Sequence, residues 1–392
     1  MSGRGGRAPR VMYLATSMGV GGAEQQARYL ARSFRRRGWD VMVVSMIPLS
    51  QDETALRAEG IVVHSLDMKP GMPDPRGMAR LVRLLREFKP DVLHSLMVHA
   101  NLLARLVRPI TRPTVVVSSV HTPNEGRQWR YVAYRMTNWL TDCTTAVSQD
   151  AIDVATTRGA APRDGIRLIG NGIDLDEYRP DAATRQRVRD ELALGDAFTW
   201  LAVGRMTGAK AYPDMVSGFA ELLTTYPDAR LLIAGSGEPD VEAAVAARIA
   251  KTGVGDRLTL LGYRGDVADL MRAVDGFLLS SAWEGLPMVL LEAASSELPI
   301  VATRVGGNED AVEDGVNGIL VRSGDPAALA EGMRTVMARD EEARHAMGRA
   351  GRDLVRRGFD LEATIDIWVA LYTELLTRKG STRGAAGQPN RP

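Results

Sequence analysis

Two successive runs of short apolar segments, each separated by longer helical patterns, leave this chain few possible folds. The short segments are rich in β-branched residues, which is typical of strands, and the longer stretches repeat their apolar residues every three and four positions, which is typical of amphipathic helices. Strands that alternate with helices form parallel sheets, because each connection crosses back over the sheet. The 392 residues are enough for two such domains.

Thirteen segments carry the strand pattern, and most are uninterrupted apolar runs, as expected for strands covered on both faces. Those of the first half are Val11–Ala15, Val41–Ser45, Ile61–Leu66, Asp91–Ser95, Thr114–Ser118, Cys143–Val147 and Ile166–Ile169. Those of the second half are Thr199–Val203, Arg230–Ala234, Arg257–Leu261, Gly276–Leu279, Ile300–Ala302 and Gly318–Val321. The pattern predicts an α/β protein of two doubly wound Rossmann-like domains.

The domain boundaries follow from where the strand pattern pauses, in the polar, Pro-containing stretch Asp174–Gly195. We predict an N-terminal domain over residues 1–178 and a C-terminal domain over 179–360. One helix is expected over 361–378. The Gly-, Pro- and Arg-rich residues 379–392 are expected to form a disordered tail.

The composition excludes several classes of protein. Apolar residues make 45% of the chain and charged residues 25%, which is ordinary for a soluble globular protein. The single cysteine, Cys143, cannot form an internal disulfide, and the five histidines are not grouped at metal-ligand spacing, so we expect no structural zinc site. No apolar run reaches the ~18–20 residues of a membrane-spanning helix, and the Arg-rich start lacks the apolar core of a signal peptide. These features predict a cytoplasmic protein.

Charge is divided unevenly between the two predicted domains. Residues 1–178 contain 24 Lys and Arg against 17 Asp and Glu, whereas the rest of the chain contains 25 against 31. Two predicted helices of the first half, Glu24–Arg37 and Arg76–Phe88, have one apolar and one basic face. The arginines of these faces are Arg28, Arg32, Arg35 and Arg36 on the first helix, and Arg76, Arg80 and Arg83 on the second.

Basic faces with few acidic neighbours are typical of helices that bind an anionic lipid surface, although a solvated face is the simpler interpretation. An acidic substrate would fit the same charge. Nucleic acid is a weaker candidate for the partner, because no DNA-binding motif is present. We therefore predict peripheral contact with an anionic membrane through the two basic helices, on the inner face of the plasma membrane.

The first strand-to-helix turn does not carry a nicotinamide-binding fingerprint. It reads MGVGGAE, Met18 to Glu24, without a full GxGxxG, and no acidic residue ends the second strand to hold a ribose. The adjacent glycines Gly21 and Gly22 still allow an anion to approach the backbone at the start of the helix, unless they form only a tight turn.

The strongest motif is SAWEGLPMVLLEAA, Ser281 to Ala294, which follows a predicted strand and opens a helix. Pro287 fits the first helical turn, and the free N–H groups there can point at a phosphate. Glu284 and Glu292 flank this turn, and carboxylates accept paired hydrogen bonds from sugar hydroxyls. A capping Glu and a structural Glu would be the plain alternative.

A second motif, VGRMTGAK, places two cations after the strand that opens the second domain. Departure of a nucleoside diphosphate builds negative charge on the leaving oxygens. Arg205 can bind this charge with two hydrogen bonds, and Lys210 adds a mobile point charge. No cluster of carboxylates calls for a divalent metal. The alternative is a solvated loop with two ordinary cations.

Together these motifs make the chain resemble the retaining GT-B glycosyltransferases of family 4, from about Val11 to Leu376. The two Glu residues with seven residues between them are specific to that group, whereas the glycine motifs only support the match. The matching segments are GVGGAE at 19–24, HTPNEG at 121–126, NGID at 171–174, GR with its Lys at 204–210, GSGE at 235–238, LGYRGDV at 261–267, EGLPMVLLE at 284–292 and VGGNEDAVEDGVNGILV at 305–321.

The resemblance implies that the domains face each other across a cleft. It assigns the nucleotide sugar to the second domain and the acceptor to the first, and implies that the last helix packs back on the N-terminal domain. It also implies that no cofactor or metal is required. The anomeric configuration is expected to be retained by a front-face route, although a covalent intermediate is not excluded by the sequence.

The resemblance also implies roles for individual residues. Glu284 should contact the donor sugar and Glu292 the ribose, while Arg205 and Lys210 should bind the diphosphate. Further residues implied near the donor are Gly21, Gly22, His121, Arg264, Leu286, Pro287, Met288 and Val289. Ala211 departs from the family pattern, which often has Gly there, but the change removes no charge.

The sequence therefore predicts a metal-independent hexosyltransferase that moves a sugar, most simply from a UDP-sugar, to a lipid-linked glycan. Relatives of this kind commonly build exopolysaccharide, capsule or lipopolysaccharide. Three alternatives remain: a transferase that uses a soluble acceptor, a nucleotide-sugar epimerase with the same fold, and an inactive sugar-nucleotide-binding protein. Glu284, Glu292, Arg205 and Lys210 together argue against the last.

Overall fold

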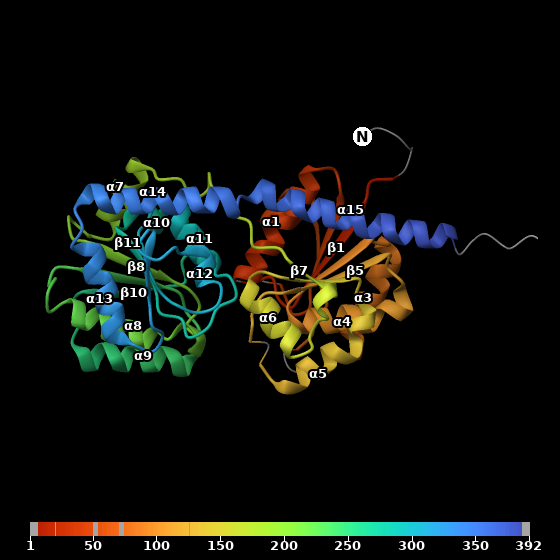
Figure 1. Ribbon diagram of the computed structural model, residues 1–392, viewed down its shortest axis with the longest axis horizontal. Coiled ribbons are helices and arrows are strands. Elements are labelled where there is room, and N and C mark those ends of the chain that lie inside the picture. The colour runs from red at the N-terminus through yellow and green to blue at the C-terminus, as the bar shows by residue number, and fades with distance from the viewer. Residues whose placement is uncertain (1–6, 20, 50–53, 70–73, 125, 386–392) are drawn as a thin grey trace, which may run out of the picture. The chain divides into compact units, whose positions relative to one another are not determined.

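A computed structural model describes residues 7–19, 21–49, 54–69, 74–124 and 126–385 of the chain (Figure 1). The chain forms two compact units. Unit 1 contains residues up to Gly172 together with those from Glu362 onward, and unit 2 contains Ile173–Leu361. Each unit is a parallel sheet with helices on both faces, which confirms the predicted α/β fold of two Rossmann-like domains.

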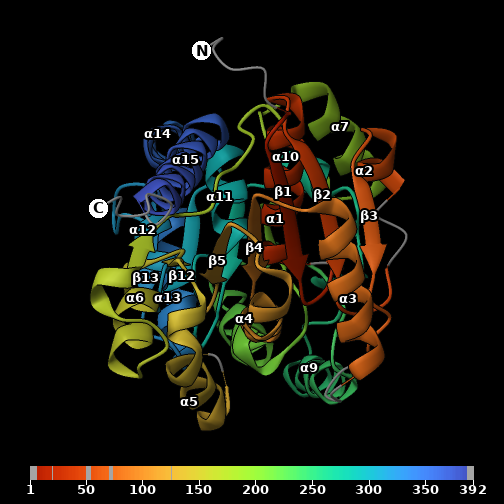
Figure 2. The same ribbon diagram turned by 90° about the vertical axis from the view of Figure 1, so that its right-hand side faces the viewer.

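The described residues of unit 1 form a seven-stranded sheet in the order β3-β2-β1-β4-β5-β6-β7, much of which can be followed in Figure 2. Its strands are β1 Arg10–Ala15, β2 Asp40–Ser45, β3 Val62–Ser65, β4 Val92–Leu96, β5 Val115–Val120, β6 Cys143–Ala146 and β7 Ile166–Leu168. Each lies at a predicted strand, with ends shifted by at most two residues. Every neighbouring pair is parallel.

The two faces of this sheet are covered by different helices. Tyr13 of β1 contacts Phe34 of α1 (Gly22–Arg36). Its neighbours Met12 and Leu14 pack with α3 (Pro75–Phe88) and α4 (Val98–Thr111). Because successive side chains of a strand point to opposite faces, α1 lies on one side of the sheet and α3 and α4 on the other. The helices are α1 Gly22–Arg36, α2 Thr54–Ala58, α3 Pro75–Phe88, α4 Val98–Thr111, α5 Gln128–Thr137 and α6 Gln149–Thr157, with short 3-10 turns η2 Asn138–Leu140 and η3 Arg163–Gly165.

The last helix, α15 Leu361–Ala385, covers the same face of the unit 1 sheet as α1. The Nδ1 atom of buried His94 lies 2.6 Å from the Tyr372 hydroxyl, and Tyr372 also packs against Phe34. The helix continues beyond residue 378, where the tail was predicted to begin, so that part of the prediction is wrong for residues 379–385. Lys379 forms an ion pair of 2.7 Å with the nearly buried carboxylate of Asp142, which anchors this end. Residues 386–392 lie outside the described part of the chain.

The boundary between the units falls after Gly172 rather than after residue 178. The N–H of Ile173 donates to the carbonyl of Phe359, and the N–H of Leu361 donates to the carbonyl of Ile173. These bonds pair the start of unit 2 with its last residues. The periodicity of the sequence cannot predict this pairing, because the paired segments are almost 190 residues apart in the chain.

The basic faces of α1 and α3 do not lack acidic partners, contrary to the sequence-based expectation. Arg32 pairs with Glu59 at 2.7 Å, and Arg80 pairs with Asp67 at 3.1 Å. Weaker pairs join Arg35 to Asp40 at 3.7 Å and Arg83 to Glu87 at 4.0 Å. The two helices also lie on opposite faces of the sheet, so one flat membrane cannot contact both basic faces.

Unit 2 has a sheet of six described strands in the order β10-β9-β8-β11-β12-β13. They are β8 Thr199–Val203, β9 Arg230–Ala234, β10 Leu258–Gly262, β11 Gly276–Leu279, β12 Ile300–Thr303 and β13 Gly318–Val321, each at a predicted position. The helices are α7 Ala182–Glu191, α8 Tyr212–Leu222, α9 Pro239–Thr252, α10 Val267–Ala273, α11 Met288–Ser295, α12 Asn308–Ala311, α13 Pro326–Met337 and α14 Glu341–Gly358, with a 3-10 turn η4 Gly208–Lys210. A core around Trp200, Phe219 and Ile233 joins the sheet to α8 and α13.

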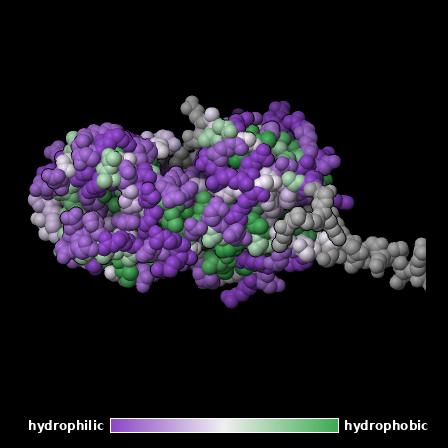
Figure 3. Space-filling view, turned by 90° about the horizontal axis from the view of Figure 1, so that it is seen from above, coloured by the Kyte–Doolittle hydropathy of each residue, from purple (hydrophilic) through white to green (hydrophobic). Residues whose placement is uncertain are grey.

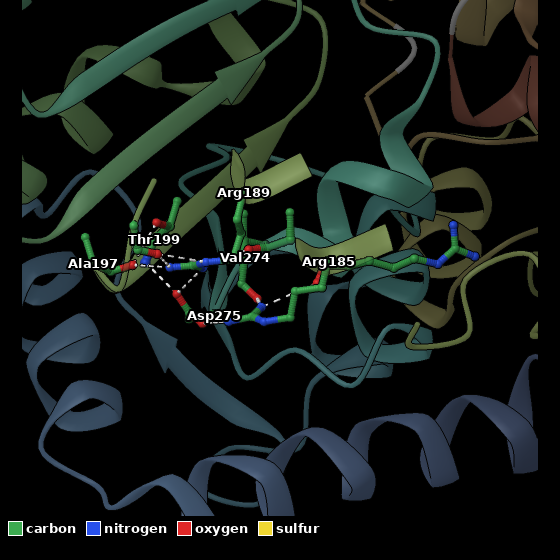
Figure 4. A network of polar contacts seen from close by, with 9 residues as sticks. Arg185, Arg189, Ala197, Thr199, Val274 and Asp275 are labelled. Carbon is green, nitrogen blue, oxygen red and sulfur yellow. Dashed lines mark hydrogen bonds and ion pairs between the residues drawn. The ribbon is translucent and has the colours of Figure 1, made fainter. Parts of the chain in front are cut away.

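Helix α7, which lies within the polar stretch 174–195, is attached to unit 2 by a network around Asp275 (Figure 4). The Asp275 carboxylate accepts hydrogen bonds from Arg185 at 2.5 Å, from Arg189 at 3.2 Å and from the backbone N–H of Thr199 at 2.8 Å. Arg189 also donates to the carbonyl of Ala197 at 2.9 Å. The network fixes the stretch next to the starts of β8 and β11, at the opposite ends of these strands from the site described below.

The face of the molecule seen in Figure 3 is mostly hydrophilic, with hydrophobic residues gathered in small areas. Among the residues that the structure describes, no helix has the length and apolar character needed to cross a membrane.

Candidate functional site

The two strongest sequence motifs follow neighbouring strands at the point where the order of the unit 2 sheet reverses. Strand β8 lies between β9 and β11, so chain connections leave it in both directions. Ligands of doubly wound folds bind outside the carboxyl ends of the strands at such a switch point. The segment with Arg205 and Lys210 follows β8, and the segment with Glu284 follows β11.

Lys210 and Glu284 are in direct contact in this structure. The Lys210 ammonium donates to Glu284 Oε1 at 2.6 Å, and the side chains are only 17% and 14% exposed. The Ser281 hydroxyl donates to the same carboxylate oxygen at 2.6 Å. The loops that carry the pair are joined by the hydrogen bond from the Ala282 N–H to the Ala209 carbonyl, 2.7 Å long. The site thus holds a cation and an anion together in a partly enclosed place.

Arg205 lies on the same loop as Lys210 but in a different environment. Its side chain is exposed, and the structure records no ion pair between it and any described acidic residue. A guanidinium in this state can bind an incoming anion without breaking an existing contact.

Glu292 is buried on α11, eight residues after Glu284 in the chain. Burial raises the pKa of its carboxyl group to about 7, although a hydrogen bond from the Tyr178 side chain lowers it. The negative charge of Glu177 raises this pKa further, and the positive charge of Lys210 lowers it. Lys210 therefore affects both carboxylates of the motif, Glu284 by direct contact and Glu292 through its charge.

The start of α11 presents free backbone N–H groups beside this cluster. Pro287 is the residue before the helix, not a residue of its first turn as predicted, and it provides no side-chain cap. The helix begins at Met288 and Val289 follows, while Leu286 and Met288 are buried. Uncapped N–H groups at a helix start attract anions, and this helix start follows four residues after Glu284, the partner of Lys210.

Glycines allow the loops around the site to approach one another. A Cβ atom on Gly235 would lie 2.0 Å from the carbonyl oxygen of Gly204, and one on Gly307 would lie 1.9 Å from that of Gly285. Neither space can hold a methyl group. Gly235 therefore lets the loop after β9 approach the loop after β8, and Gly307 lets the loop after β12 approach the loop after β11.

Arg264 is occupied by acidic partners in unit 2. It pairs with both oxygens of Asp266, at 2.7 and 2.5 Å, and with Glu191 at 3.5 Å. These contacts hold the turn after β10 and leave the ring of neighbouring Tyr263 exposed. A nucleobase can contact the exposed Tyr263 ring here, and the Arg264 guanidinium holds the turn in place.

The glycine turn of unit 1 lies at the switch point of its own sheet, after β1. Gly21 precedes α1, and a Cβ there would lie 2.4 Å from Oε2 of Glu24. The Glu24 carboxylate also accepts a short hydrogen bond from the Ser17 hydroxyl. A negative charge thus occupies the start of α1, which disfavours a second anion there. Contact of Gly21 and Gly22 with the diphosphate stays a prediction.

His121 directly follows β5 in unit 1. Burial lowers its pKa to about 4, so the imidazole is neutral near pH 7. No described residue is within hydrogen-bond distance of its enclosed Nε2 atom. A neutral imidazole with an unpaired nitrogen can bind a hydroxyl group, and the position of His121 near a sugar stays a prediction.

Two residues at this edge of unit 1 are not among the predicted site residues. Glu24 lies within the quoted motif, and its burial at the helix start is the feature that the sequence does not show. Met97, after β4, has φ 73° and ψ 160°, a conformation almost confined to glycine. The residue type of Met97 does not indicate this backbone conformation. Only its place after a strand at the switch point could have drawn attention to the position.

The arrangement in unit 2 can bind a molecule that combines negative charge with hydroxyl groups. Lys210, Arg205 and the start of α11 suit phosphate oxygens, and the two carboxylates suit hydroxyl hydrogens. Within the described ranges, no three His, Cys, Asp or Glu side chains are grouped as metal ligands.

Comparisons with known proteins point to one class of enzyme. Residues 184–354 match the family described as glycosyl transferases group 1, and residues 20–177 match the family described as glycosyltransferase family 4. The two matches correspond closely to unit 2 and unit 1.

Individual relatives are similar over most of the chain or over part of it. The UDP-Gal:alpha-D-GlcNAc-diphosphoundecaprenol alpha-1,3-galactosyltransferase of Escherichia coli is 25% identical over 318 residues, 78% of this chain and 81% of the relative. The N-acetyl-alpha-D-glucosaminyl L-malate synthase of Bacillus anthracis is 29% identical over 236 residues, 60% of each chain. The crystal structure of HepE from Anabaena with UDP and glucose superimposes with a TM-score of 0.84 at 22% identity, covering 93% of this chain and 99% of HepE.

Proposed function

Because this chain belongs to the GT-B glycosyltransferases of family 4, we propose that it transfers a sugar from a UDP-sugar to a hydroxyl of a lipid-linked glycan. The product would be a precursor of exopolysaccharide, capsule or lipopolysaccharide. The E. coli relative, whose name specifies UDP-galactose and a diphosphoundecaprenol acceptor, supports both the donor and the acceptor class.

The observation that carries this proposal is the contact of Lys210 with Glu284 beside the start of α11. A nucleotide sugar presents a diphosphate and a ring of hydroxyls next to each other, and this pair offers a cation and a carboxylate 2.6 Å apart. In the proposed complex, the diphosphate is bound by Lys210, Arg205 and the backbone N–H groups of Met288 and Val289. Glu284 accepts from sugar hydroxyls, and Glu292 accepts from the ribose.

The proposed reaction exchanges one bond at the anomeric carbon for another. The bond from this carbon to the phosphate oxygen breaks, and a bond to the acceptor oxygen forms on the same face, so configuration is retained. The acceptor proton passes to the leaving phosphate oxygen. Lys210 and Arg205 stabilise the charge that develops on the diphosphate, and His121 binds a sugar hydroxyl.

The direct test is nucleotide release from a panel of UDP-, GDP- and dTDP-sugars, with and without membrane lipid extract. We expect one UDP-sugar to be used and the lipid extract to accelerate UDP release. Proton NMR of the product reports whether the anomeric configuration is retained. Absence of turnover and of donor binding across the whole panel would contradict the proposal.

Removal of divalent metal should leave the reaction unchanged. Lys210, Arg205 and a helix N-terminus provide the positive charge that a metal provides in other transferases. We expect UDP release in excess EDTA to proceed at the rate found with added Mg²⁺ or Mn²⁺. A loss of activity in EDTA that either metal restores would contradict metal independence.

Nucleotide affinity should depend on pH through Glu292. Its pKa of about 7 lies above the ordinary value of 4.5, so the carboxylate that accepts ribose hydroxyls loses its charge as the pH falls below 7. We expect UDP to bind several-fold more weakly at pH 6 than at pH 8. Stability has the opposite slope, because the raised pKa favours the folded protein at low pH and this benefit disappears between pH 4.5 and 7.

Calorimetric titration of the wild type and Glu292→Gln at both pH values separates this effect from protonation of UDP itself. Both proteins share the contribution of UDP, and Glu292→Gln lacks the carboxylate. An equal pH dependence in the two proteins would show that Glu292 is not the responsible group.

A soluble acceptor is the second candidate, and the similarity to the L-malate glycoside synthase favours it. The lipid-extract arm of the assay distinguishes the two, since a soluble-acceptor enzyme gains nothing from lipid. An epimerase of the same fold is recognised by a changed sugar that appears without any acceptor.

A further inference from the structure

We propose that unit 1 docks on anionic lipid bilayers through an exposed apolar patch on α4, α5 and η2, and not through the basic faces of α1 and α3. The proposal rests on the lipid-linked acceptor proposed above and names the surface that would bring the protein to it. The patch consists of Leu106, Ile110, Trp129, Val132, Met136 and Trp139.

The large apolar side chains of the patch are unusually exposed to solvent. Trp139 is 76% exposed and Met136 is 72% exposed, and the other four lie between 51% and 56%. Trp129, Val132 and Met136 are spaced three and four residues apart, so they form one stripe on α5. Leu106 and Ile110 form a similar pair on α4. Large apolar side chains exposed together on neighbouring helices indicate a binding face.

Helices α4 and α5 lie on the same side of the sheet and are fixed to each other. Arg105 of α4 is fully buried and donates to the Tyr134 carbonyl of α5 at 3.2 Å and to Asn138 of η2 at 3.0 Å. The Asn101 amide also donates to the Tyr134 hydroxyl at 2.9 Å. These buried bonds hold the patch as one rigid surface, so no ordering of the helices is needed on binding.

The charge around the patch is positive, which selects the occupant. Residues 98–140 contain six arginines and a single acidic residue, Glu125. Arg112, Arg127 and Arg135 are exposed, and no ion pair joins them to an acidic residue in the described ranges. Tryptophan at an interface with arginine around it matches the headgroup region of an anionic leaflet, where indoles sit and cations find phosphates.

Other surfaces of unit 1 fit a membrane less well. Arg32 and Arg35 of α1 already have partners in Glu59 and Asp40, and Arg37 beyond the helix pairs with Glu362 and Asp366 of α15. On α15, Ile367 is the single large apolar side chain recorded as exposed among those described. The α4–α5 side therefore combines apolar and cationic character as the other side does not.

The test is sedimentation of the full chain with vesicles, compared between two kinds of variant and two matched controls. Vesicles contain equal parts of phosphatidylglycerol and phosphatidylcholine, or phosphatidylcholine alone. The apolar variant carries Trp129→Gln and Trp139→Gln, and the charge variant carries Arg112→Gln, Arg127→Gln and Arg135→Gln. The controls are Ile367→Gln, an exposed apolar residue on the other face, and Arg35→Gln with Arg36→Gln on α1.

We expect the wild type to bind anionic vesicles and to lose binding as salt is added. Each arginine removed should weaken binding about fivefold, or about a hundredfold for the three, at low ionic strength. Each tryptophan removed should weaken it about tenfold. Both controls should bind within about twofold of the wild type. UDP affinity and thermal unfolding of every variant verify that the fold is intact.

Several results would overturn the proposal: equal binding by the wild type and both patch variants, loss of binding only in the α1 control, or no preference for anionic vesicles. Analytical ultracentrifugation without lipid tests whether a second copy of the chain occupies the patch instead. A wild-type dimer that the tryptophan changes dissociate, with vesicle binding unchanged, would show that the patch joins two chains. The vesicles contain no donor or acceptor, so failure to transfer sugar with vesicle binding intact refutes the proposed function and leaves the docking surface standing.

Discussion

Replacement of Lys210 by Ala should lower the rate of UDP release from the donor about 10²–10³-fold, the usual loss when one preorganised charge-stabilising group is removed. The Lys210 side chain is only 17% exposed, and its ammonium pairs with Glu284, four residues before the start of α11. In this enclosed place, water cannot replace the lost charge on the leaving diphosphate. Steady-state assays with the donor found in the panel measure the effect.

A matched control for this change is Lys251→Ala. Lys251 is an exposed lysine of the same unit, on α9, and its removal changes the net charge by the same amount. We expect its activity to stay within about twofold of the wild type. Equal losses in the two variants would show that overall charge, and not the position of Lys210, controls the rate.

Glu284→Gln distinguishes direct binding of the diphosphate from an indirect role of Lys210. If the lysine only holds Glu284, the two single variants and the double variant should show the same defect. If Lys210 binds the diphosphate, Lys210→Ala should weaken the binding of UDP, which carries no sugar, and Glu284→Gln should not. Calorimetry with UDP and with the intact donor separates these cases.

Replacement of Gly307 by Ala should damage both the fold of unit 2 and its activity. The added Cβ would lie 1.9 Å from the Gly285 carbonyl oxygen, and backbone atoms cannot move aside as a flexible side chain does. We expect a loss of about 1–3 kcal/mol in the free energy of unfolding. Because Gly285 adjoins Glu284, displacement of this loop should lower activity about 10²-fold, the order of loss that a 1 Å misplacement causes.

Urea denaturation and donor turnover measure the two effects of Gly307→Ala. Gly358→Ala is the matched control, because Gly358 ends α14 and a Cβ there would meet no atom within 4 Å. The control should keep full activity and wild-type stability or slightly more. Wild-type stability and turnover in Gly307→Ala would show that the two loops do not approach each other as described.

The architecture of the two units could be predicted from local sequence pattern. All thirteen described strands lie at predicted segments, because a buried parallel strand must be an apolar run whatever its neighbours are. The motif after β11 could also be recognised, since a Pro before a helix and Glu residues eight apart are local features. Strand ends shifted by one or two residues, because they depend on pairing with a neighbouring strand.

The long-range contacts could not be predicted in this way. The α1 arginines seemed unpaired in sequence, yet Glu59 lies 27 residues from Arg32 and the two meet only in the folded unit. The helix predicted to end at 378 continues to Ala385, and its Lys379 meets Asp142, more than 200 residues earlier in the chain. The periodicity of α1 does not indicate Glu59, and the periodicity of α15 does not indicate Asp142.

The sequence by itself determined which elements form and which residue types stand at the carboxyl ends of the strands, because both depend on neighbours a few positions apart. Only the tertiary structure decided what those residues meet. Strands β8 and β11 became neighbours, so Lys210 could pair with Glu284, and burial on α11 raised the pKa of Glu292. The same folding buried one face of α5 and left Trp129 and Met136 in water. Burial and charge pairing are properties of the packed chain, which is why no local pattern contains them.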